Sequence, residues 1–377
     1  MQGEWIELDE TAFYPGGGGQ EADAGTIGGL PVAEVKSKGA VLHRVPDHRF
    51  EVDQTVECEV DWNRRYDLMK GHSGEHLLFS ALSKRVPGLE LVKIAVTPTK
   101  KSVVVKGAVT WSTIAEVQGE VNDLISSGLE ISERWVSRDD PGIEAVRAKL
   151  DRIHGERVRI VSIGEIDRAA CAGIHVRSTR EIGALLITRL TSARPSGDWE
   201  IEFEVDERAI RSALEIASAG LRASDVLGSN PQDLISSLVN LKRESESLRD
   251  SVKWLGRKML RELVPQSEDG IDIYSGTFVG IGKKELIDAA NSMIERGRSC
   301  CILMAKDDKL LLLVACSPGL RIDCSDIVSK AMRRAGGKGG GQRHFAMGGA
   351  GATDMADEIF EEALELVRAE IKGRAGQ

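Results

Sequence analysis

The chain has 377 residues, of which 41% are hydrophobic, and a formal net charge of −9. This length predicts two or three domains with buried cores, and the negative charge argues against non-specific adhesion to nucleic acid, so any nucleic-acid site must be local. The sequence contains no run of about 18 apolar residues and begins with an acidic segment, so we expect a cytoplasmic protein with no membrane partner.

Residues 1–53 predict a small β-rich module, because short alternating runs such as EWIEL are separated by glycine-rich turns. Residues 54–205 mix helical and strand patterns, and we expect the chemically active core of the protein to lie there. Apart from Cys171, the cysteines show neither zinc-ribbon spacing nor the density of a disulfide framework, so we expect them to be buried thiols in a reducing compartment.

Two pairs of potential metal ligands lie within residues 54–205. His72 and His76 stand at i and i+4 in a segment with helical periodicity, so both imidazoles project from one face and can chelate one ion. Cys171 and His175 have the same spacing and follow the strand-like run RVRIVSIG, so a loop or a helix start can bring them to that ion. Three imidazoles and a thiolate suit one zinc ion per chain, although four protein ligands are also what a closed structural site uses.

Residues 206–262 predict a helical connector. After a break at GSNPQD, leucines recur every seven residues and form a heptad seam, namely Leu234, Leu241, Leu248 and Leu255. Another helix must cover such a seam, either the preceding helix folded back on it or a helix of a second chain. We expect the preceding helix to be about half as long as a full partner, which favours a homodimer formed through the connector and the C-terminal domain.

Residues 263–377 predict a separate α/β domain, because strand-like runs such as CCILMAKDDKLLLLVAC alternate with helical ones. Near its end a glycine-rich loop is expected in AMRRAGGKGGGQRHFAMGGAGA, where four cations cluster, namely Arg333, Arg334, Lys338 and Arg343. Accessible backbone amides and cationic side chains can hold the phosphates of a nucleic acid. The alternative is a flexible connector with no ligand.

Taken together, four motifs resemble a known family. DETAFYPGGGGQEADAG, GHSGEHLLFSAL, CAGIHVRSTREIG and GGKGGGQRHFAMGGA occur in that order, and the set resembles the freestanding alanyl-tRNA editing proteins of the AlaX type in their long form, related to the editing half of alanyl-tRNA synthetase. The resemblance covers nearly the whole chain. It implies an α+β multidomain protein with an N-terminal β-barrel module (1–53), a zinc-dependent editing core (54–205), a helical connector (206–262) and a DHH-associated C-terminal domain (263–377).

The resemblance implies hydrolysis of tRNA(Ala) mischarged with serine or glycine. Carried over by motif, His72, His76, Cys171 and His175 match the zinc-binding positions, and the aminoacyl ester would lie beside the Zn²⁺ ion. The ion would polarise the ester carbonyl or lower the pKa of bound water.

Further residues of the same motifs are candidates for substrate contacts. The glycines Gly16, Gly17, Gly18 and Gly19 would allow close approach of the backbone to the substrate. Gln20 could bind polar groups of the substrate or be a solvated side chain, and Thr11 could bind a serine hydroxyl or cap a turn. Glu75 is either a general base or a carboxylate on the helix surface.

The sequence departs from the family pattern at CAGIH, where Ala172 and Ile174 add bulk beside the single glycine, Gly173. This bulk could narrow the pocket or alter the loop. The segment LELVKIAV offers no hydroxyl before Thr97, which weakens the expectation that serine rather than glycine is removed.

Three alternative functions remain open. His72 to His76 reads H-x-x-E-H, the inverted zincin pattern of a metalloprotease, but that pattern leaves Cys171 and His175 without a role. A phosphoesterase is suggested by the C-terminal domain, but no Asp-His-His triplet occurs in the sequence. The non-enzymatic alternative is a tRNA-binding or dimerisation module with a structural zinc.

Overall fold

The structure is a computed structural model that describes residues 3–140, 142–143, 146–147, 156–193, 197–351 and 354–375. The chain divides into two compact units, Met1–Ala223 and Ser224–Gln377, and each is described by itself. Both units combine helices with sheets, which confirms a mixed α/β protein. None of the helices in the described ranges is long and apolar enough to cross a membrane.

The N-terminal part of the first unit is built from short strands. They are β1 (Trp5–Glu7), β2 (Gly25–Ile27), β3 (Leu30–Pro31), β4 (Glu34–Lys38), β5 (Ala40–Arg44) and β6 (Cys58–Val60). Their pairing gives two three-stranded sheets, β1-β5-β4 and β3-β2-β6, around buried Ile6, Phe13 and Ile27. The β-rich expectation is confirmed, but the closed barrel implied by the resemblance is wrong for the described strands, because these two sheets are not hydrogen-bonded to each other.

The rest of the first unit packs helices against two further sheets. Its elements are α1 (Trp62–Arg85), β7 (Glu90–Val96), β8 (Lys101–Lys106), α2 (Trp111–Ser127), β9 (Ile131–Ser137), β10 (Arg157–Ile163), β11 (Asp167–Ala170), the 3₁₀ helix η3 (Thr179–Ile182), β12 (Leu185–Ala193) and β13 (Asp198–Val205). The sheets have the orders β12-β13-β8-β7 and β11-β10-β9. These two sheets together position the candidate site, because β7 pairs with the glycine-rich N-terminal loop and β11 leads into the CAGIH motif.

Helix α1 places polar residues in the interior. It begins after Asp61, whose side chain accepts a hydrogen bond from the backbone N–H of Arg64, and it ends before Pro87, which disfavours helical geometry at the preceding residue. Every residue from Gly71 to Leu82 is buried. Because buried polar groups need partners, this position requires that the histidines of α1 be hydrogen-bonded or bound to a ligand.

The connector is helical, as predicted, with α3 (Asp206–Leu227), the 3₁₀ helix η4 (Pro231–Asp233) and α4 (Leu234–Arg261). The expected difference in length is wrong: α3 has 22 residues and α4 has 28. Helix length therefore gives no reason to prefer a second chain as the partner of the leucine seam. The boundary between the two compact units falls within α3.

The second unit contains one six-stranded sheet with the order β14-β15-β16-β17-β19-β18. Its elements are β14 (Gln266–Glu268), β15 (Ile271–Phe278), α5 (Lys283–Ile294), β16 (Ser299–Lys306), β17 (Leu310–Cys316), α6 (Cys324–Arg334), β18 (Lys338–Gln342), β19 (Phe345–Ala350) and α7 (Ala356–Ala375). Strands β15 and β16 are parallel and are joined through α5, as the alternation of strand and helix predicted.

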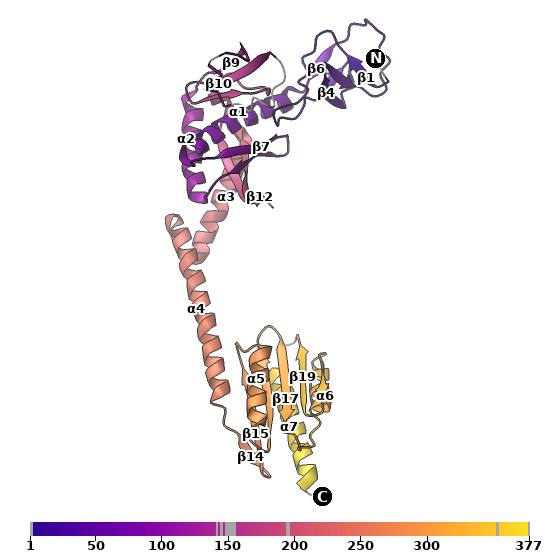
Figure 1. Cartoon of the computed structure of the whole chain (residues 1–377), viewed down its shortest axis with the longest axis vertical. Coiled ribbons are helices and arrows are strands. Elements are labelled where there is room, and N and C mark those ends of the chain that lie inside the picture. Colours follow the sequence, from indigo (N-terminus) through magenta and orange to yellow (C-terminus); the bar gives the residue numbers. More distant parts are fainter. Residues whose placement is uncertain are drawn as a thin grey trace. The chain divides into compact units, whose positions relative to one another are not determined.

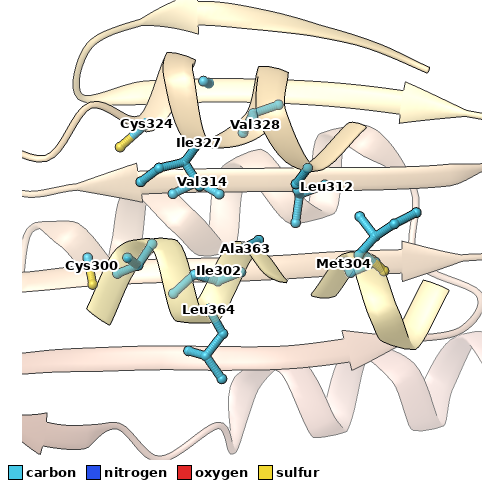
Figure 2. Close-up of a cluster of buried hydrophobic side chains, with 14 of the residues drawn as sticks. Cys300, Ile302, Met304, Leu312, Val314, Cys324, Ile327, Val328, Ala363 and Leu364 are labelled. Atoms are coloured by element: carbon cyan, nitrogen blue, oxygen red, sulfur yellow. The ribbon is translucent and has the colours of Figure 1, made fainter. Parts of the chain in front are cut away.

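Side-chain alternation along the central strands separates two cores. On β16, Cys300, Ile302 and Met304 pack with α6 and α7, as Figure 2 shows. Cys301 and Leu303 point to the other face and pack with α5. Helices therefore cover both faces of this sheet (Figure 1). A strand that is buried on both faces must be apolar throughout its length.

The glycine-rich segment near the C terminus is not the loop that was expected. It forms the antiparallel strands β18 and β19, with Gly339 opposite Gly348. A side chain is excluded at several of these positions: a Cβ on Gly348 would lie 2.5 Å from Met332 Cγ. Close packing of α6 on the hairpin therefore explains these glycines without a ligand.

Candidate metal centre

The structure brings together the four predicted metal ligands. His72 and His76 come from one face of α1, and Cys171 and His175 come from the loop after β11. One potential ligand atom of each residue lies within 4.8 Å of the others. The two sequence pairs thus form one cluster, which can hold a metal ion, and the loop alternative for the second pair is the one observed.

Each of the three imidazoles is held at Nδ1 by a different residue. His72 Nδ1 lies 2.8 Å from Gln20 Oε1, His76 Nδ1 lies 2.7 Å from Asp167 Oδ2, and His175 Nδ1 lies 3.1 Å from Ser73 Oγ. When Nδ1 carries the proton that is donated in such a bond, Nε2 is left with a free lone pair. This is how proteins orient histidines that bind metals.

The Nε2 atoms face the thiol of Cys171. The distance to Cys171 Sγ is 3.4 Å from Nε2 of His72 and 3.4 Å from Nε2 of His175. Burial raises the pKa of the Cys171 thiol, but the charge of His72 and hydrogen bonds from His175, His72 and His76 outweigh it and hold the pKa far below its ordinary range. A lowered pKa favours the thiolate, the form that binds metal.

Asp167 and Arg147 fix the second histidine of α1. Burial raises the pKa of Asp167, but its hydrogen bond to His76 and the charge of Arg147 outweigh burial and lower the pKa to about 2. Arg147 donates to Asp167 Oδ2 over 2.8 Å, and its guanidinium lies over the ring of Phe79. A permanently charged carboxylate at Nδ1 makes Nε2 of His76 a stronger electron donor.

The N-terminal glycine motif lies against this cluster. All four of its glycines, Gly16, Gly17, Gly18 and Gly19, have positive φ angles, and a Cβ on Gly18 would lie 3.6 Å from His72 Cε1. The loop is held by Val96 of β7, which donates a backbone hydrogen bond to Gly19 and accepts one from Glu21, and Arg65 of α1 binds Asp23 beyond the end of the loop. The close approach expected of this backbone is therefore an approach to the metal-ligand cluster.

Gln20 is not the solvated side chain of the alternative prediction. It is 3% exposed, and its Oε1 accepts both from His72 and from the backbone N–H of Ile174, 3.1 Å away. Gln20 therefore joins the helix pair to the CAGIH loop. Its Nε2 has no hydrogen-bond acceptor among the described residues.

The single glycine of CAGIH has a steric cause. A Cβ at Gly173 would lie 2.0 Å from His72 Cε1, whereas Ala172 and Ile174 occupy neighbouring positions without entering this contact. Arg159 holds the loop by donating to the carbonyl oxygens of Cys171 and Gly173. The extra bulk in this motif is thus accommodated around one indispensable glycine.

Two further predicted residues have surroundings that the sequence did not indicate. The hydroxyl of Thr11 lies 2.8 Å from His43 Nε2 and also accepts from the N–H of Phe13, so it is engaged within the N-terminal module. Glu75 is fully buried, and a helix-surface carboxylate is therefore the wrong description of it. Its Oε2 lies 4.0 Å from Nε2 of His76.

Sequence reasoning missed three residues of the site, Asp167, Arg147 and Ser73. Asp167 stands four residues before Cys171, and Ser73 directly follows His72, so both were close to the motifs. Their burial was the missing signal, because Asp and Ser are mostly exposed and a sequence alone assigns them to the surface. Arg147 reaches the site from a separate segment and carried no local signal.

The basic residues predicted to bind tRNA lie in the second unit. Arg333 and Arg334 end α6, Lys338 begins β18, and Arg343 lies between β18 and β19. Arg334 forms ion pairs with Glu358 and Glu362 of α7. Arg343 Nε lies 3.7 Å from Asp323, the residue that caps α6. Half of the predicted cluster is thus partly neutralised by acidic neighbours.

Comparison with known proteins agrees with these motifs. Residues 158–198 match the family described as the threonyl and alanyl tRNA synthetase second additional domain. The alanyl-tRNA editing protein AlaX-L of Pyrococcus horikoshii is 28% identical, over 97% of this chain and 92% of that protein. The C-Ala domain of Aquifex aeolicus alanyl-tRNA synthetase matches 27% of this chain at 19% identity with a TM-score of 0.26.

Alanine–tRNA ligases are also similar, but only in part of their length. The ligase of Thermotoga sp. (strain RQ2) is 27% identical over 96% of this chain and 44% of the ligase. That of Methanothermobacter thermautotrophicus is 28% identical over 94% of this chain and 41% of the ligase. The chain thus spans less than half of these ligases and nearly all of AlaX-L. By this measure, and as its motifs predicted, the chain is similar to the alanyl-tRNA editing proteins of the AlaX type over nearly their whole length.

Proposed function

We propose that this protein is an aminoacyl-tRNA deacylase that hydrolyses tRNA(Ala) mischarged with serine or glycine, with one zinc ion at His72, His76, Cys171 and His175. The observation that carries the proposal is the arrangement of three imidazoles, each held at Nδ1, around one thiolate. The similarity to AlaX-L over nearly the whole chain supports the class of substrate.

The residues present fit zinc. Three imidazole nitrogens and one thiolate match the nitrogen and sulfur ligands that zinc prefers in tetrahedral sites. His72 is fully buried and His76 is 2% exposed, so neither ring is in contact with bulk solvent. Hydrogen bonds to all three Nδ1 atoms supply the outer shell that such sites require.

A zinc ion held there would polarise the ester carbonyl or acidify a water molecule. The chain's own residues would then orient the substrate. Gln20 Nε2, which is buried and has no acceptor among the described residues, is available to donate a hydrogen bond to an oxygen of the ester. The glycines of the N-terminal loop would let the terminal nucleotide lie close to the backbone.

Selection of the amino acid follows from size more readily than from a hydroxyl contact. Thr11, the expected partner of a serine hydroxyl, is bonded to His43. Strand β7, Glu90–Val96, contributes no hydroxyl. The proposal therefore covers both serine and glycine, and their relative rates decide between them.

The experiment compares Ser-, Gly- and Ala-tRNA(Ala) as substrates, with and without a chelator, and includes the Cys171→Ala variant. We expect hydrolysis of the seryl or glycyl ester, little hydrolysis of the alanyl ester, and loss of both activity and zinc in Cys171→Ala. Full zinc content in that variant would remove Cys171 from the site. Absence of hydrolysis with zinc bound would contradict the deacylase.

One alternative has specific support. Four protein ligands close a tetrahedral shell, as in structural zinc sites, which fits a tRNA-binding or dimerisation protein that retains a structural zinc. Binding of tRNA(Ala) without hydrolysis would favour it. The metalloprotease is disfavoured, because Cys171 and His175 lie beside the H-x-x-E-H histidines instead of being idle.

A further inference from the structure

Glu75 is an unusual residue in this fold, because it is a carboxylate buried without hydrogen bonds. It is 0% exposed, and neither Oε1 nor Oε2 has a hydrogen-bond partner among the described residues. Removing an ionised carboxylate from water is costly unless a cation or hydrogen bonds compensate for it. The cationic groups that the structure places near Glu75 are Arg147 and, when it is protonated, His76, and a metal ion at the cluster would add a further positive charge.

The position of Glu75 directs its charge toward the metal ligands. It stands three residues after His72 and one before His76, so it shares the ligand-bearing face of α1. Its Oε2 lies 4.0 Å from Nε2 of His76. Nε2 is the potential ligand atom of His76 in the four-residue cluster, because Nδ1 of the same ring is engaged by Asp167.

The other charged groups around the cluster are already paired. Asp167 binds Arg147 through both carboxylate oxygens, and Arg159 binds Glu133. Arg147 is also attracted to Glu75, although its hydrogen bonds to a carboxylate go to Asp167. Two carboxylates, those of Asp167 and Glu75, thus face the single positive charge of this arginine.

We propose that Glu75 is the second anionic group of the metal centre, so that this pocket balances the charge of a divalent cation. The proposal rests on the metal site of the proposed function and does not depend on the tRNA substrate. Three neutral imidazoles and a thiolate would leave a divalent ion with one excess positive charge in a buried pocket. Glu75 supplies the missing negative charge at the Nε2 side of His76.

The test uses the full chain and zinc alone as the probe. Glu75→Gln keeps the shape and removes the charge, Glu75→Asp keeps the charge, and Glu116→Gln removes an exposed charge from α2 as the matched control. Zinc affinity is measured by competition with a chromophoric chelator. Thermal unfolding is measured with and without zinc. We expect Glu75→Gln to weaken zinc binding by about tenfold or more, the size of effect seen for outer-shell partners, and to leave the other two variants close to the unmodified protein.

The metal-free measurement separates this role from a structural one. If Glu75 acts toward the metal, Glu75→Gln lowers the unfolding midpoint of the zinc-loaded protein more than that of the metal-free protein. Unchanged zinc affinity, an equal loss in both forms, or a metal-free variant that does not fold would each overturn the proposal. Zinc binding that depends on Glu75 in a protein without deacylase activity would overturn the proposed function and leave this inference standing.

Discussion

Nδ1 of His76 lies 2.7 Å from Oδ2 of Asp167, and this contact joins α1 to β11 at the metal centre. The carboxylate accepts the proton of Nδ1, which leaves Nε2 as the ring atom available to a metal ion. Arg147 holds the same carboxylate from the other side. A ligand on one element is therefore oriented by a residue on another, and metal affinity depends on both.

We expect Asp167→Asn to weaken zinc binding by about tenfold to a hundredfold, the usual effect of losing an outer-shell carboxylate. The amide has the same shape, but it cannot carry the negative charge that strengthens Nε2 as a donor. Competition with a chelator measures the change. Asp123→Asn, on the exposed side of α2, is the control, and equal affinities of the two variants would contradict the role given to Asp167.

The same contact predicts the pH dependence of stability in the metal-free protein. Burial lowers the pKa of His76, but the hydrogen bonds to Asp167 and Cys171 and the charges of Cys171 and Glu75 outweigh it, and the pKa rises from 6.5 to about 10. A raised pKa stabilises the fold fully below the unfolded value and loses this effect as pH rises through the folded one. The lowered pKa of Cys171 acts in the opposite sense up to the ordinary thiol value of 9.0, so a comparison with Asp167→Asn is needed to isolate His76. We therefore expect the stability advantage of the unmodified protein over Asp167→Asn to shrink between pH 6.5 and about 10.

Urea unfolding at a series of pH values checks this decrease. Asp167→Asn removes a hydrogen bond that raises the pKa of His76 and leaves Cys171 in place, so the difference between the two proteins reports on His76. Bound zinc should remove the pH dependence of this difference, since the metal takes the place of the proton on Nε2. A difference between the metal-free proteins that stays constant over this range would refute the prediction.

We expect Gly173→Ala to disrupt the metal centre. Its Cβ would lie 2.0 Å from His72 Cε1, so either the ring or the loop must shift, at a cost of about 1–3 kcal/mol in unfolding free energy. Zinc content and denaturant unfolding measure the two consequences. Ala172→Gly, one position away, is the control and should keep zinc. Normal zinc affinity in Gly173→Ala would show that the loop yields without cost.

The metal ligands could be predicted from sequence because they follow local rules. Spacing places His72 and His76 on one face of any helix, and few cysteines and histidines compete for the same ion. The partners at Nδ1 follow no such rule. Asp167 becomes a partner of His76 only because β11 packs against α1, and Glu75 is buried because α1 runs through the interior.

The fold was predictable to a similar depth. Strand and helix periodicities indicated the mixed α/β class and the alternating elements of the second unit, since each face of β16 packs against helices. Local composition gave a wrong prediction where glycine fits two kinds of structure, a flexible loop and a closely packed strand. The run from Lys338 to Gln342 resembles a flexible loop, yet the glycines serve close packing between a hairpin and α6.

We expect the four basic residues of the second unit to contribute unequally to tRNA binding. Lys338→Glu and Arg333→Glu should weaken binding and reduce the salt slope by about one contact each. Arg334→Glu should have less effect on binding, because Arg334 already pairs with Glu358 and Glu362. Binding at several salt concentrations measures the slopes, and zinc content should stay unchanged. Identical slopes in all variants would place tRNA elsewhere.

The last prediction concerns the leucine seam of α4. Leu241 is 50% exposed, Leu248 is 60% exposed and Leu255 is 51% exposed in the single chain. Polar side chains surround them on a helix of 28 residues, so the seam is a narrow apolar stripe of the kind that pairs with another helix. The described residues of one chain leave these three leucines at least half exposed, so exposure, and not helix length, favours a second copy of the chain as the partner of the seam.

We expect a homodimer at micromolar concentration, and we expect Leu241→Asp combined with Leu248→Asp to yield monomers. Light scattering measures the mass of both proteins. Ser247→Asp, which lies between the two leucines in the sequence but outside both apolar rows of the seam, is the matched control and should remain dimeric. The monomeric variant should keep its zinc, because the metal ligands belong to the first compact unit. An unmodified protein that is monomeric would assign the seam to contacts within one chain, since an apolar stripe of this length is unfavourable in water.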